Sequence, residues 1–210
     1  MIVIQLLVND SNASADATSQ TAFGGLPSAG EGGLHWPICK TCHGHMQFLG
    51  QLRSGEALGD RLLLLFECQN RPGLCDDWDA DGGGNAVMVV ATESPQLVQA
   101  PPVGETTRPI RHGASVVRVE AGNYDQARQQ WASQAGKAAR DVLGQLGGEP
   151  SWIQGDETPS CNTCGERMAF VAQLEEGPEA RSAMNFGGGG CAYLFQCGGC
   201  ETSAKMLWQC

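Results

Sequence analysis

Eight of the ten cysteines in this 210-residue chain form four close pairs, and paired thiols are groups that bind metal. The pairs are Cys39 with Cys42, Cys68 with Cys75, Cys161 with Cys164, and Cys197 with Cys200. A Cys-x-x-Cys turn presents two thiolates on one side, and two facing pairs complete the tetrahedral site that structural zinc prefers. The sequence therefore predicts two structural zinc ions per chain, the first held by the first two pairs and the second by the last two.

The first predicted site is less regular than the second. Six residues separate Cys68 from Cys75, so either a wider turn brings Cys75 to the metal or His43 or His45 replaces it. A closed four-cysteine site leaves no position for a reacting water, which favours a non-catalytic protein. An incompletely coordinated first site would instead suit a metal-dependent or thiol-dependent enzyme, and this alternative stays open.

The remaining two cysteines, Cys191 and Cys210, have no counterpart in the first half of the chain and are expected to be free thiols. An oxidation-sensitive or zinc-sensitive regulatory role for these two thiols is a further hypothesis.

The chain repeats part of its own sequence. CKTCHGHMQFLGQL at residues 39–52 is similar to CNTCGERMAFVAQL at residues 161–174, and NAVMVV at 85–90 is similar to SAKMLW at 203–208. In each copy, a tryptophan precedes the Cys-x-x-Cys pair and a glutamine follows it (Trp36 and Gln51 around Cys39–Cys42; Trp152 and Gln173 around Cys161–Cys164). These four residues are candidates for partner binding, although each glutamine could instead bond the backbone.

The repeat divides the chain into two similar halves, residues 1–91 and 110–210. A proline-containing stretch, residues 92–109, is predicted to link them. The high glycine content and few aromatic residues favour short strands and turns, and hence a mainly β (α+β) fold. One amphipathic helix is predicted in the second half, from about Tyr124 to Leu143, with Asn123 as N-cap and Gly144 just past its end. The apolar opening MIVIQLLV lacks a basic start, so we expect a β-strand there and not a signal peptide.

The charge and composition of the chain restrict the classes of molecule that it is expected to bind. The formal net charge is −10, and scattered Lys and Arg argue against nucleic-acid binding. The sequence has no apolar run long enough to span a membrane. Ten cysteines without a secretion signal favour a cytoplasmic protein with reduced thiols. A basic protein client would complement the acidic surface.

The order Gly-Gly-x-Pro, Trp, Cys-x-x-Cys, Met-x-Phe-x-x-Gln-Leu and then a strand ending in Cys resembles the bacterial YwqG-like domains of unknown function. It is also similar to the N-terminal region of programmed cell death protein 2. Residues 23–75 and 146–208 carry the resemblance. It implies a mainly β, two-part fold and a protein-binding role, chaperone-like or immunity-like, without catalytic residues.

Overall fold

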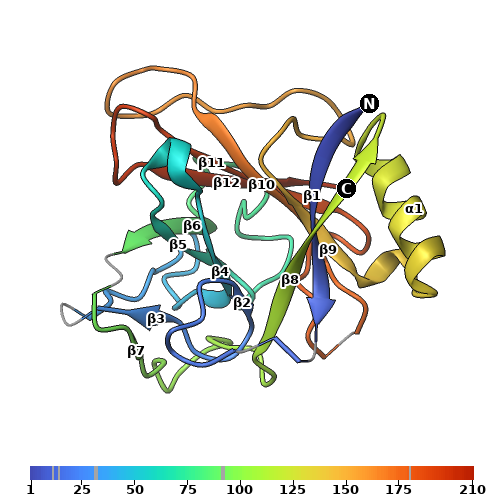
Figure 1. Cartoon of the computed structure of the whole chain (residues 1–210). Helices are drawn as coiled ribbons and strands as arrows, with labels where there is room; N and C mark the ends of the chain where they lie inside the picture. Colours follow the sequence, from blue (N-terminus) through green and yellow to red (C-terminus); the bar gives the residue numbers. More distant parts are fainter. Residues whose placement is uncertain (11, 14, 31–32, 91–92, 180) are drawn as a thin grey trace.

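The computed structural model describes residues 1–210 apart from positions 11, 14, 31–32, 91–92 and 180, and it is built mainly from β-strands (Figure 1). Ten strands form one antiparallel sheet in the order β12-β11-β10-β9-β1-β8-β2-β4-β5-β6. Their bounds are β1 (Ile2–Asp10), β2 (Ala22–Phe23), β4 (Gln47–Arg53), β5 (Leu62–Glu67), β6 (Asn85–Val90), β8 (His112–Ala121), β9 (Val142–Leu146), β10 (Ala169–Glu175), β11 (Cys191–Gln196) and β12 (Ala204–Gln209). A small second sheet pairs β3 (Ser28–Ala29) with β7 (Gln96–Leu97). The mainly β class is confirmed.

The long strands β1 and β8 lie side by side at the centre of the sheet and are exchanged between the two parts of the chain. On its other side, β1 pairs with β9, with Leu7 opposite Gly144. The strand β8 has β1 on one side and β2 on the other, where Phe23 lies opposite His112. Each part of the chain therefore places its first strand beside strands of the other part. The strand β7 lies within the stretch predicted to be a linker, and the predicted division into halves stays a prediction.

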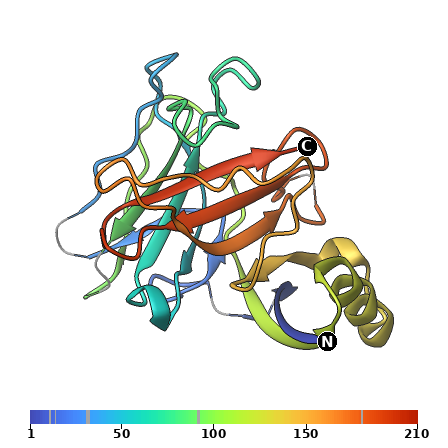
Figure 2. The ribbon, with the colours of Figure 1, turned by 90° about the horizontal axis from the view of Figure 1, so that it is seen from above.

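The sheet curls until its two end strands, β6 and β12, approach one another. Figure 2 shows β10–β12, in orange and red, crossing the teal and green strands β4–β6. The backbone N–H of Trp208 in β12 donates to the carbonyl of Trp78, in the loop before β6, at 3.1 Å. This hydrogen bond joins the two ends of the sheet. The central core fills the space between the two parts of the curled sheet, with Leu65 on one side and Leu194 on the other. The sheet is thus nearly closed.

The single α-helix of the described residues, α1 (Tyr124–Ala135), packs on one face of β1 and β8. Its predicted N-cap is confirmed, because the side chain of Asn123 accepts a hydrogen bond from the amide of Gln126 at 2.9 Å. The predicted end at Leu143 is wrong. The helix ends at Ala135, and the next residue, Gly136, adopts the left-handed conformation (φ 62°) that suits a C-cap glycine. The predicted last turn instead forms a short 3₁₀ turn, η2 (residues 139–141), and the strand β9.

Two further cores lie on the outer faces of the curled sheet and contain the paired cysteines. Phe48 and Phe66 pack against the first cysteine group. Tyr193 and Phe195 pack against the second. Most strand residues near the cysteines are buried, which holds the ends of these strands in fixed positions.

Candidate metal centres

Each first cysteine pair sits on a tight turn just before a long strand. In the first turn, the amide of Cys39 donates to the carbonyl of Gly44 at 2.9 Å, and the amide of Met46 donates to the carbonyl of Pro37 at 3.0 Å. The corresponding residues make the corresponding bonds in the second turn: Cys161 to Glu166 at 2.8 Å and Met168 to Pro159 at 3.0 Å. The two repeated sequences therefore adopt the same local backbone geometry.

Each second cysteine pair follows the next strand. Cys68 comes directly after β5, and Cys197 comes directly after β11. Their partners, Cys75 and Cys200, return to the same place through turns of different length. In the longer turn, the amide of Leu74 donates to the carbonyl of Arg71 at 3.0 Å, which reverses the chain towards Cys75.

The structure brings together all eight predicted metal ligands in two groups of four. The sulfurs of Cys39, Cys42, Cys68 and Cys75 lie within 4.8 Å of one another, and so do those of Cys161, Cys164, Cys197 and Cys200. The first group includes Cys75 and neither neighbouring histidine, so the sequence alternative of a histidine ligand is not what the geometry favours. The first group therefore offers four cysteine sulfurs to a metal ion.

The spacing of these sulfurs fits a tetrahedral metal ion. A metal–sulfur bond of about 2.3 Å places the sulfurs of a tetrahedron about 3.8 Å apart. The Sγ atoms of Cys42 and Cys68 lie 3.5 Å apart, and so do those of Cys164 and Cys197. All of these cysteines are free, with no disulfide among the described residues. Each group could therefore hold one metal ion, with four thiolates as ligands.

The surroundings lower the pKa of two ligand thiols, Cys161 and Cys42, towards the thiolate that a metal needs, and raise the pKa of Cys68, Cys75, Cys164 and Cys200. A hydrogen bond between the Sγ of Cys161 and the Oγ of Ser203, 3.2 Å apart, lowers the pKa of Cys161 to about 5. At Cys42, burial raises the pKa, but the backbone amide of Gly44 and the neighbouring thiols outweigh it, and the net pKa falls to about 7. Burial raises the pKa of Cys75, so this thiol needs the positive metal ion to ionise.

The two centres differ in how well they are covered. The first is sheltered by Asn70, whose Nδ2 lies 3.5 Å from the Sγ of Cys68 and 3.9 Å from the Sγ of Cys42. The second has Gly198 and Gly199 in the corresponding turn, and a Cβ on either would meet no atom within 4 Å. Sequence reasoning missed Asn70 and Ser203, because a single polar residue near a cysteine carries no distinctive spacing.

The tryptophans proposed for partner binding are half-buried beside the metal centres. The Nε1 of Trp36 donates to the carbonyl of Met46 at 2.7 Å, and its ring meets that of Phe66 edge-on at 5.3 Å. The ring of Trp152 lies 4.4 Å from that of Tyr193. Each tryptophan thus covers one outer core.

The two glutamines proposed for partner binding are buried, with exposed fractions of 0% for Gln51 and 2% for Gln173. The Oε1 of Gln51 accepts from the amide of Ser28 at 3.0 Å, and the Oε1 of Gln173 accepts from the amide of Ser151 at 2.9 Å. The sequence left open whether these glutamines bind a partner or bond the backbone, and in the structure both bond the backbone. Neither side chain lies at the surface.

The two unpaired cysteines occupy different environments. Cys191 is 5% exposed, and burial together with the nearby Glu175 raises its pKa to about 12. Cys210 is exposed at the chain end. Neither belongs to a metal group, as expected.

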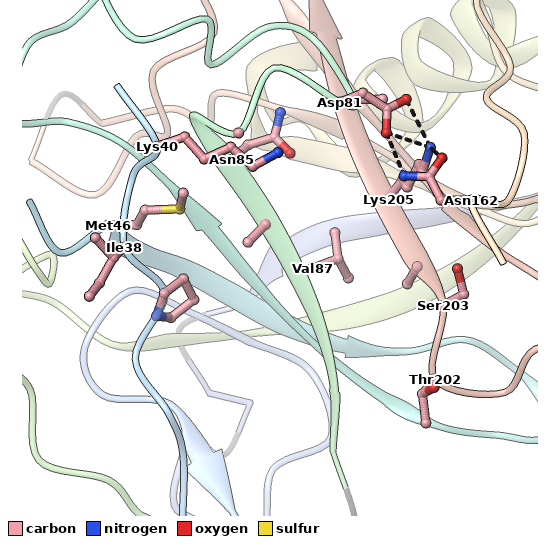
Figure 3. Close-up of a pocket in the computed structure, with 15 residues that line it drawn as sticks. Ile38, Lys40, Met46, Asp81, Asn85, Val87, Asn162, Thr202, Ser203 and Lys205 are labelled. Carbon is pink, nitrogen blue, oxygen red and sulfur yellow. Dashed lines mark hydrogen bonds and ion pairs between the residues drawn. The ribbon is translucent and has the colours of Figure 1, made fainter. Parts of the chain in front are cut away.

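A groove of about 490 Å³ is lined by residues of both cysteine-bearing parts of the chain (Figure 3). The first metal turn contributes Ile38 and Lys40, the strand β6 contributes Val87, and the segment leading into β12 contributes Thr202. The far wall is a network that joins the two parts of the chain. The walls of the groove therefore come from both metal-bearing parts.

The network in that wall centres on Lys205, which is 8% exposed. Its Nζ donates to Asp81 at 2.7 Å and to the Oδ1 of Asn162 at 2.8 Å. The Nδ2 of Asn162 in turn donates to Asp81 at 2.9 Å, and the hydrogen bond from Lys205 lowers the pKa of Asp81. Asn162 lies inside the second metal turn, so the network fastens that turn to the loop before β6.

A second, acidic cleft of about 280 Å³ adjoins the groove. Its lining includes Trp78, which is 42% exposed, the carboxylates of Asp79 and Glu157, and the apolar Leu207. Neither carboxylate forms an ion pair with any residue that the structure describes. The Oδ1 of Asp79 accepts from the backbone amides of Asp81 and Gly82, and the Oε2 of Glu157 accepts from the Nε2 of Gln209. The cleft therefore presents two hydrogen-bonded carboxylates, each without an ion-pair partner among the described residues, beside an aromatic ring.

Comparison with known proteins gives limited guidance. No known family profile matches the chain. The chain is 42% identical over 70 residues to the uncharacterized protein YpfL of Salmonella typhimurium. The match covers 32% of this chain and only 15% of that protein, and the name of that protein carries no activity. Among the described residues, no helix is long and apolar enough to cross a bilayer.

Proposed function

We propose that the chain is a non-catalytic protein-binding module whose two centres each hold one structural zinc ion. The observation that supports it is the assembly of eight reduced thiols into two groups of four, each at tetrahedral spacing. Four thiolates are the usual ligand set of structural zinc. Cys39, Cys42, Cys68 and Cys75 would hold the first ion, and their equivalents the second. Zinc would supply cross-linking between loops, with no coordination position left for substrate.

The need for reduced thiols bears on where the protein works. Disulfides form readily in secreted proteins, whereas the cytoplasm keeps thiols reduced and able to bind zinc. The cysteines of each centre are free and close together, and oxidation would join them. A cytoplasmic location follows as part of the proposal.

The partner proposed is a basic protein client, in a chaperone-like or immunity-like relationship. The net charge of −10 would steer such a client towards the molecule. The acidic cleft suits one cationic side chain of the client, because a Lys or Arg could lie against Trp78 and pair with Asp79 and Glu157. Such a surface repels nucleic acid.

Two measurements test the proposal. Elemental analysis of protein purified without added metal should give two zinc ions per chain, and a colourless solution separates zinc from iron, since iron–thiolate centres absorb visible light. Pull-down at low and moderate salt should recover a basic protein, and recovery should fall for Glu157→Gln but not for Glu120→Gln, an exposed charge outside the cleft. A metal-free protein would refute the zinc assignment, and equal recovery by all three proteins would refute the proposed client site.

A further inference from the structure

The two metal centres are alike in sulfur geometry but unequal in exposure. In the first centre, Cys39, Cys68 and Cys75 are 0% exposed and Cys42 is half-buried. In the second centre, Cys164, the equivalent of Cys42, is exposed. Oxidation of a cysteine follows its thiolate character and its exposure. Because all eight sulfurs would be thiolates when bound to metal, exposure is what separates the two centres. The chain therefore carries one sheltered and one accessible thiolate centre.

The cause of this inequality lies in the two second-pair turns. The longer first turn carries Asn70, whose Nδ2 faces two sulfurs and also donates to the carbonyl of His45 at 2.9 Å. Its Oδ1 accepts from the amide of Glu105 at 3.4 Å, so the segment before β8 is held over the first centre as well. The residue in the same position of the second turn, two after the cysteine, is Gly199. It has open space where Asn70 has contacts.

We infer that Cys164 is an oxidation site for hydrogen peroxide and that its oxidation releases the metal of the second centre while the first centre keeps its own. This inference rests on the proposed zinc centres. The thiolate of Cys164 attacks one peroxide oxygen, the O–O bond breaks, and the products are a sulfenic acid and hydroxide. The thiolate of Cys197, 3.5 Å away, then attacks the sulfenic sulfur and expels a second hydroxide. Peroxide is reduced, and the two thiolates are oxidised to one disulfide.

Loss of the metal follows from the ligand count. A disulfide between Cys164 and Cys197 removes two of the four thiolates, and the remaining two, Cys161 and Cys200, cannot hold a tetrahedral ion alone. The centre joins the Cys161–Cys164 turn to the end of β11, and Asn162 in that turn bonds Lys205 and Asp81. Oxidation would therefore loosen the wall of the groove in Figure 3.

The test uses the full chain loaded with two zinc ions. Hydrogen peroxide is added in the presence of a chromophoric zinc chelator, and thiols are mapped by isotope-coded alkylation and mass spectrometry. We expect one equivalent of zinc to leave about tenfold or more faster than the second, since exposure controls thiolate oxidation. The early product should contain a Cys164–Cys197 disulfide, with the four thiols of the first centre still reduced.

Exchange of the sheltering residue provides matched variants. Asn70→Gly should accelerate release of the slow equivalent, and Gly199→Asn should retard release of the fast one. Gly199→Ala is the control, because it adds a Cβ in open space without the amide. Circular dichroism before oxidation checks that each variant is folded. If Asn70→Gly destabilises the first centre, the comparison of Gly199→Asn with Gly199→Ala still tests the inference.

The outcomes separate the inference from the proposal it rests on. Release of both equivalents together, or oxidation of the first centre before the second, would overturn the inference while leaving two zinc centres in place. Purified protein that contains no zinc would overturn the proposed function itself. Alkylation of Cys164 no faster than that of Cys42 would also contradict the inference.

Discussion

Replacing Gln51 by Leu tests whether this residue serves the fold or a partner. Leucine keeps a similar volume but cannot accept the hydrogen bond from the amide of Ser28, which is itself 0% exposed. A buried donor without an acceptor costs about 1–3 kcal/mol. The bond from the Nε2 of Gln51 to the carbonyl of Ser19, at 2.6 Å, is lost as well and contributes about 1 kcal/mol. We expect a total loss of about 2–4 kcal/mol.

For a chain of this length, each kcal/mol lowers the Tm by about 2–4 °C, so Gln51→Leu should melt about 5–15 °C below the parent protein. Differential scanning calorimetry of metal-replete protein measures the change, and urea unfolding gives the free energy directly. Gln129→Leu, on the exposed side of α1, is the matched control and should leave the Tm nearly unchanged. A Tm equal to that of the parent protein, with weakened client recovery, would show that Gln51 acts in binding and would refute this reasoning.

Two further predictions concern the ligands of the first metal centre and the ion pair between Lys205 and Asp81. Cys75→Ser should reduce bound zinc from two equivalents to about one, whereas His43→Ala should leave two; the reverse pattern by elemental analysis would restore the histidine ligand. Asp81 has a pKa below its ordinary value of 3.8 because Lys205 bonds its carboxylate, so this pair stabilises the fold above that pH and the contribution is lost as acid protonates Asp81. Because the Asp81 side chain is 55% exposed, the effect should be no more than about 1 kcal/mol. Asp10 and Asp156 also have lowered pKa values, so both the parent protein and Lys205→Met should lose stability in acid. In urea unfolding as a function of pH, the stability advantage of the parent protein over Lys205→Met should shrink as the pH falls below 3.8.

The sequence predicts the two groups of four cysteines well because their information is local. A Cys-x-x-Cys turn needs only a few residues to fix its geometry, and the strands that carry the second pairs are continuous apolar runs. The position of Cys75 could not be derived, since a turn with six intervening residues has many conformations. The shelter given by Asn70 depends on a contact with a distant segment around Glu105, which no spacing rule encodes.

The errors lie where tertiary contacts decide. The predicted helix is too long because Gly136 provides an earlier left-handed cap and the residues after it pair with β1. The sequence match of Met88 with Met206 is displaced by one residue. In the sheet, Met206 is paired with Leu194, and the equivalent of that pair is Leu65 with Val87. An alignment of short apolar strands cannot detect such a shift, whereas the hydrogen-bond register can.

The exchange of β1 and β8 has a consequence for synthesis on the ribosome. The strand β1 finds its two neighbours only when β8 and then β9 have been made, much later in the chain. Until then, the apolar residues of β1, such as Leu6 and Leu7, have no sheet to join. Contacts so distant in sequence slow folding and leave intermediates with exposed apolar surface that are prone to aggregate. A nascent chain of this protein should therefore itself need protection from aggregation until its last strands appear.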